Sequence, residues 1–196
     1  MRGSAGVIGD GYYGARIVNQ GVIRADDSGG LVGNFAYDTG YSGGSATSTS
    51  AVIDTSGVSD PAPQAVYQTG RWWDRNFSYV LKDLTPGASY TVRLHFAEPS
   101  YSGAGQRQFH VVINGVQVLT NFDIVAAAGG QYKAVVREFT ATADGNGQIT
   151  IDFNRGARDY PLVNGIEVLS GGVVVQAINC GLLAGGTITI NPSSFT

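Results

Sequence analysis

Apolar and polar residues alternate along much of the chain from about residue 66 onward. In the clearest case, apolar side chains fill every second position from Tyr90 to Phe96, and polar residues stand between them. A period of two is that of a half-buried β-strand. The same pattern predicts strands in the segments 77–81, 109–113, 116–119, 135–140, 149–153 and 163–169. No segment keeps a period of 3.6, and the run 126–128 is too short for a helix and meets Gly129, so no helix is predicted.

Turn signals separate these segments. Asn114-Gly115 is a strong hairpin signal between two predicted strands, because both residues tolerate a positive φ. The segments 84–88 and 144–147 carry the Pro, Gly, Asp and Asn residues that favour tight turns. Strands that recur every 8–12 residues with turns between them are typical of antiparallel sandwiches. We therefore predict an all-β protein, an antiparallel, jelly-roll-like β-sandwich with long aromatic-bearing loops.

The two ends of the chain differ from this centre. Residues 1–16 are predicted to be a vector leader and flexible N-terminal segment, because the start Met-Arg-Gly-Ser reads like an expression leader. Residues 17–170 are predicted to form the sandwich, in which the small polar run 45–50 is a loop. Residues 171–196 are predicted to be a C-terminal tail with a further strand at 187–190.

Composition and charge exclude several classes of function. Glycine makes up 29 of 196 residues and charged residues only 14%, which agrees with many turns and short strands. The formal net charge of −3 gives no electrostatic case for binding nucleic acid. No apolar run approaches the ~18 residues of a membrane span. A single Cys excludes an intramolecular disulfide and a multi-thiolate zinc site.

Signals for catalysis, metals and cofactors are weak. Glu98 and Asp159 supply the carboxylate pair that a glycosidase needs, but such pairs are common in a chain with 15 acidic residues. The G-x-G-x-x-G spacing at 9–14 has no preceding strand and no helical pattern after it. We predict no enzyme and no cofactor. A structural calcium ion is compatible with a binding sandwich, although no dense Asp/Asn loop is found.

Aromatic residues gather in predicted loops and at strand ends. They are Tyr37, Tyr41, Tyr67, Trp72, Trp73, Tyr101 and Tyr160. Sugars present C–H faces that pack on aromatic rings, so aromatic loops on a rigid sandwich favour carbohydrate binding. Core packing is the default role for any single ring, and we assign it to Tyr67 and Trp72. Tyr101 is the stronger loop candidate, because Pro, Ser and Gly residues surround it.

The segment 66–72, VYQTGRW, resembles the VYQTERW segment of malectin and malectin-like carbohydrate-binding modules. Further matches follow in the family's order at 76–79, 84–90, 92–98, 106–109, 113–115, 121–124 and 164–168, so the resemblance covers about residues 31–169. The family's opening strand, similar to AINAGG, has a poor counterpart at 17–21 and a better one at 177–181. The later segment either begins a second, truncated module or folds back into the first-strand position.

The resemblance implies a non-catalytic module that binds glucose-containing oligo- or polysaccharides through loop aromatics and an Asp. The candidate carbohydrate-binding residues are Phe35, Tyr37, Tyr41, Tyr101, Asp159 and Tyr160. Arg155 and Arg158 are expected to hold the Asp159 carboxylate in place, and Glu98 is expected to accept hydrogen bonds from its loop.

One departure from the family keeps a second interpretation open. The aromatic pair after the F-A-E motif falls here on Ser100 and Tyr101, so only half of it is aromatic. The alternative is a structural or adhesive interaction domain with a degenerate sugar site. In either case the resemblance implies a secreted, bacterial, extracellular protein. It would be a monomer or part of a multimodular chain, attached to a larger enzyme or adhesin, without nucleic-acid or membrane partners.

Overall fold

The computed structural model describes residues 35–183. The predicted leader at 1–16, the segment 17–21 and the predicted strand 187–190 lie outside these residues. Within the described range, no helix has both the length and the apolar character that crossing a membrane requires.

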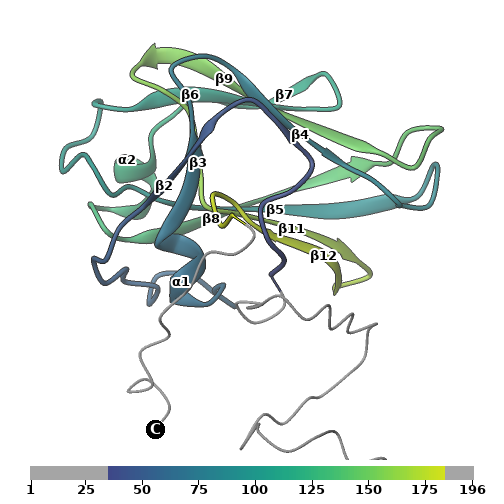
Figure 1. Cartoon of the computed structure of the whole chain (residues 1–196), viewed down its shortest axis with the longest axis horizontal. Helices are drawn as coiled ribbons and strands as arrows, with labels where there is room; N and C mark the ends of the chain where they lie inside the picture. The colour runs from purple at the N-terminus through teal and green to yellow at the C-terminus, as the bar shows by residue number, and fades with distance from the viewer. Residues whose placement is uncertain (1–34, 184–196) are drawn as a thin grey trace, which may run out of the picture.

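Three sheets of antiparallel strands build the fold (Figure 1). The five-stranded sheet has the order β1-β4-β9-β6-β7, the four-stranded sheet β12-β11-β5-β8, and the small three-stranded sheet β10-β3-β2. The strands are β1 (Tyr41–Ser42), β2 (Ser45–Ser48), β3 (Thr69–Trp72), β4 (Phe77–Leu81), β5 (Ser89–Ala97), β6 (Gln108–Ile113), β7 (Val116–Phe122), β8 (Ala134–Thr142), β9 (Ile149–Arg158), β10 (Leu162–Val163), β11 (Gly165–Ser170) and β12 (Val173–Asn179). Two short helices, α1 (Gln64–Tyr67) and α2 (Ile124–Ala128), complete the described elements.

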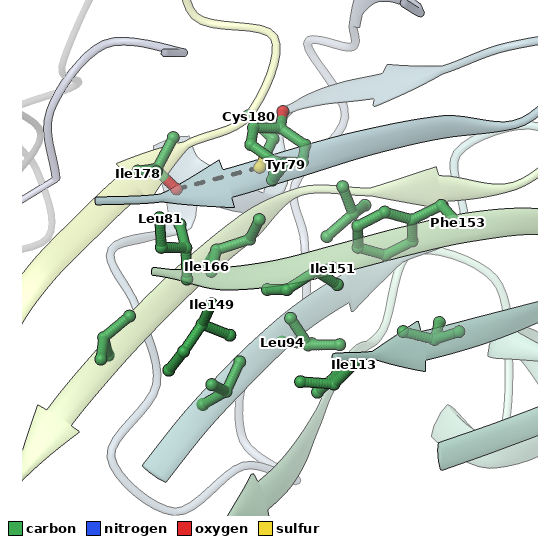
Figure 2. Close-up of a cluster of buried hydrophobic side chains, with 14 of the residues drawn as sticks. Tyr79, Leu81, Leu94, Ile113, Ile149, Ile151, Phe153, Ile166, Ile178 and Cys180 are labelled. Carbon is green, nitrogen blue, oxygen red and sulfur yellow. Dashed lines mark hydrogen bonds between the residues drawn. The ribbon is translucent and has the colours of Figure 1, made fainter. Parts of the chain in front are cut away.

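The alternating apolar residues meet between the two larger sheets. In β4 the burial pattern alternates, with Phe77, Tyr79 and Leu81 buried and the residues between them partly exposed. The corresponding side chains of β5, β6, β9 and β11 belong to the same core cluster, part of which Figure 2 shows. Burying this apolar surface is the main stabilising contribution to such a fold. The prediction of an all-β antiparallel sandwich is confirmed.

The Asn114-Gly115 turn joins β6 to β7 as predicted. Asn114 has φ 48° and Gly115 has φ 78°, the two positive values that a tight hairpin turn of this kind requires.

The four-residue helix α1 contradicts the expectation of no helix. Two further segments also differ from the sequence-based expectation. The run 45–50 contains a strand, β2, which pairs with β3 from Ser45 opposite Trp72 to Ser48 opposite Thr69. The run 126–128 ends a five-residue helix, α2, whose N-terminus is capped by the Asp123 carboxylate and whose C-terminus ends at Gly129 in the left-handed region. Neither element shows an apolar period, because one consists of small polar residues and the other has barely more than one turn.

The segment after residue 170 folds back onto the sandwich. Strand β12 pairs with β11 along its length, and Ile178, Cys180 and Leu182 are buried. On its other side, the end of this segment runs parallel to residues 36–38. The backbone N–H of Ala36 donates to Ala177, that of Asn179 to Ala36 and that of Asp38 to Leu182, over 2.8 to 2.9 Å. Ile178 and Cys180 therefore belong to the main core cluster, and Ala177 and Leu182 pack in a second buried cluster with Phe35.

Candidate functional site

A β-bulge at the end of β9 places Asp159. Gln108 pairs with Arg158 but Phe109 pairs with Arg155, so β9 holds two additional residues there. Gly156 is one of them, and a Cβ on it would lie 2.4 Å from the Gln108 carbonyl oxygen. Bulges bend a strand and redirect the side chains that follow. Asp159 comes directly after the bulged strand, in the left-handed region with φ 50°.

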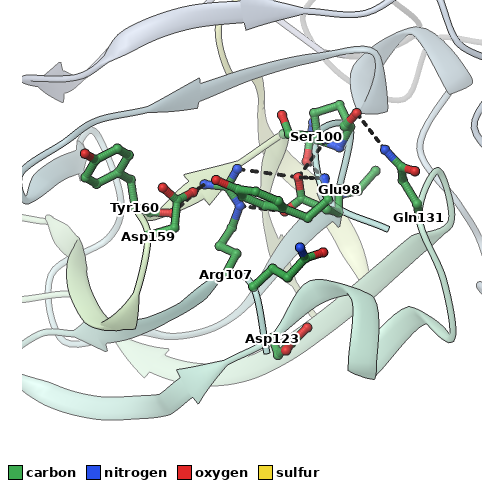
Figure 3. A network of polar contacts seen from close by, with 12 residues as sticks. Glu98, Ser100, Arg107, Asp123, Gln131, Asp159 and Tyr160 are labelled. Atoms are coloured by element: carbon green, nitrogen blue, oxygen red, sulfur yellow. Dashed lines mark hydrogen bonds and ion pairs between the residues drawn. The ribbon is translucent and has the colours of Figure 1, made fainter. Parts of the chain in front are cut away.

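Arg107 joins two carboxylates from different loops (Figure 3). Glu98 follows β5, Arg107 precedes β6 and Asp159 follows β9. The Arg107 guanidinium donates from Nε to Glu98 Oε2 over 2.5 Å, and its Nη1 lies 3.0 Å from Asp159 Oδ2. Nη1 also donates to the Tyr160 carbonyl oxygen over 2.6 Å. The Glu98 side chain is fully buried, whereas that of Asp159 is 17% exposed, so Asp159 is the carboxylate that can reach a ligand.

The loop after β5 presents Tyr101 beside Asp159. The second carboxylate oxygen of Glu98 accepts hydrogen bonds from the backbone N–H groups of Ser100 (2.8 Å) and Tyr101 (3.2 Å), which confirms its expected role. The Arg107 guanidinium carbon lies 5.2 Å from the centre of the Tyr101 ring. Desolvation by burial, the nearby Asp159 charge and hydrogen bonding to Asp159 together raise the pKa of Tyr101.

Tyr160 forms an aromatic pair with Trp72. Their ring centres are 5.9 Å apart with planes inclined by 34°, and both side chains are partly exposed. Trp72 therefore lies beside the candidate site, although sequence reasoning assigned it to the core. The predicted core role applies to part of the side chain, which packs against the main core cluster. Its position at a strand end, followed by the polar segment 74–76, is the sequence signal that could have indicated partial exposure.

A second polar cluster lies on the other side of β3. The buried Asp38 carboxylate accepts from Arg71 Nε over 2.8 Å, from the Tyr79 hydroxyl over 2.7 Å and from the Gly181 N–H over 2.6 Å. Burial alone would lower the pKa of Arg71, but the hydrogen bond and charge of Asp38 outweigh it and raise the pKa. The Arg71 guanidinium carbon lies 3.3 Å from the centre of the Tyr41 ring, which is 41% exposed.

Strand β3 connects the two clusters. Trp72, at its end, pairs with Leu162 of β10 on one side and with Ser45 of β2 on the other. Neighbouring strands lie about 4.8 Å apart. The short strand β1, which holds Tyr41 and precedes β2, and the loop before β10, which carries Tyr160, therefore flank the same end of β3.

The structure thus brings three predicted residues together and separates others from them. Tyr101, Asp159 and Tyr160 meet around Arg107, and Tyr41 lies across β3 from them. Phe35 is only 3% exposed and packs against His95, so no ring face is open to a ligand. Tyr37 is partly buried against the same cluster as Phe35.

The partner of Asp159 differs from expectation. Neither Arg155 nor Arg158 holds its carboxylate. Arg107 does, from the position just before the neighbouring strand β6. Tyr67, assigned to the core, is indeed buried. Its hydroxyl lies 2.9 Å from His95 Nδ1, and His95 Nε2 lies 2.9 Å from Glu167 Oε2.

Neither a metal centre nor the described cavity coincides with the candidate site. Among residues 35–183, no group of three or more His, Cys, Asp or Glu side chains is arranged to hold a metal ion. A shallow cavity of about 310 Å³ lies between residues 57–59 and β8, with Arg93 in its wall. None of the candidate carbohydrate-binding residues lines it.

Comparison with known proteins gives one consistent result. The model of the malectin domain matches residues 16–166. Receptor-like protein 4 of Arabidopsis thaliana is 34% identical over 135 residues, which cover 66% of this chain and 21% of that protein. Human malectin is 28% identical over 126 residues, covering 59% and 43% respectively. The crystal structure of the ANX1 ectodomain from Arabidopsis thaliana superposes with a TM-score of 0.58 at 20% identity, over 64% of this chain and 38% of that one.

The chain therefore spans less than half the length of each of these relatives, and the match to the ANX1 ectodomain concerns the fold alone. The match to the family model, in contrast, extends over most of the sequence. On this evidence the chain belongs to the malectin domain family.

Proposed function

We propose that this protein is a non-catalytic carbohydrate-binding module that recognises glucose-containing oligo- or polysaccharides. The observation that carries the proposal is the juxtaposition of Tyr101, Asp159 and the Tyr160–Trp72 pair at one end of the sandwich. Aromatic rings offer packing surfaces for the C–H faces of a sugar, and a fixed carboxylate accepts hydrogen bonds from its hydroxyls.

The geometry also argues against glycoside hydrolysis. Glu98 and Asp159 both bond to the single Arg107 guanidinium, and the Glu98 carboxylate additionally accepts two backbone N–H groups. A general acid must reach the glycosidic oxygen of the substrate, whereas these bonds occupy both oxygens of the Glu98 carboxylate, which is fully buried. A binding role suits this arrangement, because the same bonds keep the loop and Asp159 in one conformation.

We further propose that the module acts outside the cell as part of a longer chain. The family match and the name of the ANX1 ectodomain support an extracellular setting. A bacterial origin and attachment to a glycoside hydrolase or an adhesin stay predictions from the sequence.

One observation favours the alternative, a structural or adhesive domain with a degenerate sugar site. Ser100 occupies the position where the family carries an aromatic residue, and its contribution here is a backbone N–H bonded to Glu98. The remaining aromatic surface would then have to suffice for sugar binding.

Calorimetric titration with α- and β-linked gluco-oligosaccharides distinguishes the two functions. We expect weak, enthalpy-driven binding, lowered on the order of tenfold in Tyr101→Ala, since a stacked ring contributes about 1–2 kcal/mol. Asp159→Asn should also weaken binding. Asp83→Asn is the matched control, because Asp83 is exposed and likewise has a positive φ. Binding of no oligosaccharide at millimolar concentration by folded protein would favour the alternative.

A further inference from the structure

An exposed arginine lies against the Tyr160 ring. The Arg155 guanidinium carbon is 5.0 Å from the centre of that ring, and Nη1 donates to the Asp74 carbonyl oxygen over 3.2 Å. These two contacts position the planar group beside the Tyr160–Trp72 pair and leave most of its N–H donors unused. Arg155 is nevertheless exposed and takes part in no ion pair among residues 35–183.

Two more exposed arginines occupy neighbouring positions. Arg75 lies in the loop after β3, which docks on β9 through a hydrogen bond from the Arg155 N–H to Asn76 Oδ1 (2.9 Å). Arg158 precedes Asp159 directly. Within the described part of the chain, neither forms an ion pair. The segments 73–76 and 154–158, which adjoin the Tyr160–Trp72 pair, thus hold three exposed arginines.

The acidic groups near this end do not neutralise the three arginines. Glu98 and Asp159 share the single cation Arg107, which leaves one negative charge there, and Asp38 is paired with Arg71. Asp74 is the single acidic residue in the segment 73–76. The segments 73–76 and 154–158 together hold three arginines and one acidic residue, so these two segments carry a local excess of positive charge, although the whole chain has a formal net charge of −3. Such a local field attracts anionic ligands to one place on a protein that repels them elsewhere.

We infer that this face selects acidic sugars, with the carboxylate of a uronic acid bound by Arg155 while the sugar ring packs beside Tyr160. The inference rests on the proposed carbohydrate-binding function and specifies its ligand class. A guanidinium presents a planar pair of donors that matches the two oxygens of a carboxylate. Contact with an aromatic face keeps that plane fixed, so that less side-chain entropy is lost on binding.

The test compares ligands that differ only at C6. Cellotetraose and maltotetraose are each titrated in three forms. These are the neutral parent, the form whose C6 groups are oxidised to carboxylates, and the methyl ester of that oxidised form. We expect the oxidised forms to bind about tenfold more tightly than the neutral parents, as for a hydrogen bond to a charged group. The methyl esters should return to the parent level, and added salt should weaken only the oxidised forms.

The variants assign the effect to the arginine. Arg155→Ala should lower affinity for the oxidised ligands about tenfold, and Arg155→Lys should restore part of it. Lys82→Ala is the matched control. It removes an exposed charge just after β4, at the end away from Phe77, and should leave all affinities unchanged.

Three outcomes would overturn the inference. Neutral tetraoses that bind as tightly as their oxidised forms contradict it and leave the proposed function standing. A dextran sulfate of equal charge that binds more tightly than the glucuronates contradicts the assignment to a carboxylate. If none of the six tetraoses binds to folded protein, the proposed function fails with it.

Discussion

The Glu98 carboxylate and the Arg107 guanidinium form a buried ion pair in which Nε and Oε2 are 2.5 Å apart. Arg107→Ala would leave Glu98 charged and without its cation in a fully buried position. We expect the free energy of unfolding to fall by about 3–5 kcal/mol, the usual cost of breaking a buried pair on one side. Denaturant unfolding measures it, with Arg158→Ala, an exposed arginine, as a control that should change stability by less than about 0.5 kcal/mol.

A double variant tests the cause of that loss. In Glu98→Gln combined with Arg107→Ala neither position of this pair carries a charge, so the destabilisation should be smaller than the sum of the two single effects. Strict additivity would show that the pair does not interact energetically.

The bulge in β9 predicts a strong response at one glycine. In Gly156→Ala the new methyl group would lie 2.4 Å from the Gln108 carbonyl oxygen and 2.8 Å from the Phe109 Cα. Backbone must then move, so we expect a loss of stability of about 1–3 kcal/mol together with weaker sugar binding, because Asp159 follows the bulge. Gly145→Ala is the matched control, since no heavy atom lies within 4 Å of its Cβ position. Equal melting temperatures for the two variants would contradict the role given to Gly156.

Trp72 should contribute to ligand binding as well as to packing. Trp72→Leu keeps an apolar side chain against the core but removes the aromatic face beside Tyr160. We expect affinity for the best gluco-oligosaccharide to fall on the order of tenfold. Circular dichroism establishes that the variant is folded, and an unchanged dissociation constant would exclude Trp72 from the binding face.

The buried Tyr67 hydroxyl predicts how stability depends on alkaline pH. Desolvation by burial raises the pKa of Tyr67 to about 12 from its ordinary value of 10. Between these values the folded protein keeps a proton that the unfolded chain has lost, so stability falls as pH rises from 10 to 12. The contribution is at most about 2–3 kcal/mol. Unfolding curves of Tyr67→Phe should show a shallower fall over this range than the wild type, whereas Tyr41→Phe, at an exposed ring, should not.

The sequence predicted the large sheets because their strands bury one face. Alternation identifies β4, β5 and β9, where every second side chain enters the core. It could not identify β2, whose Ser, Ala and Thr residues have no apolar face and which is held by pairing with β3. Whether such a run forms a strand depends on a partner distant in sequence.

The candidate site was only partly predictable for a related reason. Tyr101 and Asp159 could be placed on loops from the family resemblance, but their common partner Arg107 could not. Its contact with Asp159 depends on the register between β6 and β9, including the bulge at Gly156. Phe35 is apolar and precedes a polar segment in the sequence, so its burial depends on packing that the sequence alone does not show.

The parallel contact between residues 36–38 and residues 177–182 has a mechanical consequence. Tension applied at Phe35 and Leu183 acts at opposite ends of this contact, because the two segments run in the same direction. The hydrogen bonds that join Ala36 and Asp38 to the later segment are then loaded together rather than broken one after another. A module that binds a polysaccharide while tension acts at these two residues would therefore be loaded in shear. Force spectroscopy should find a higher rupture force between residues 35 and 183 than between residues 35 and 115.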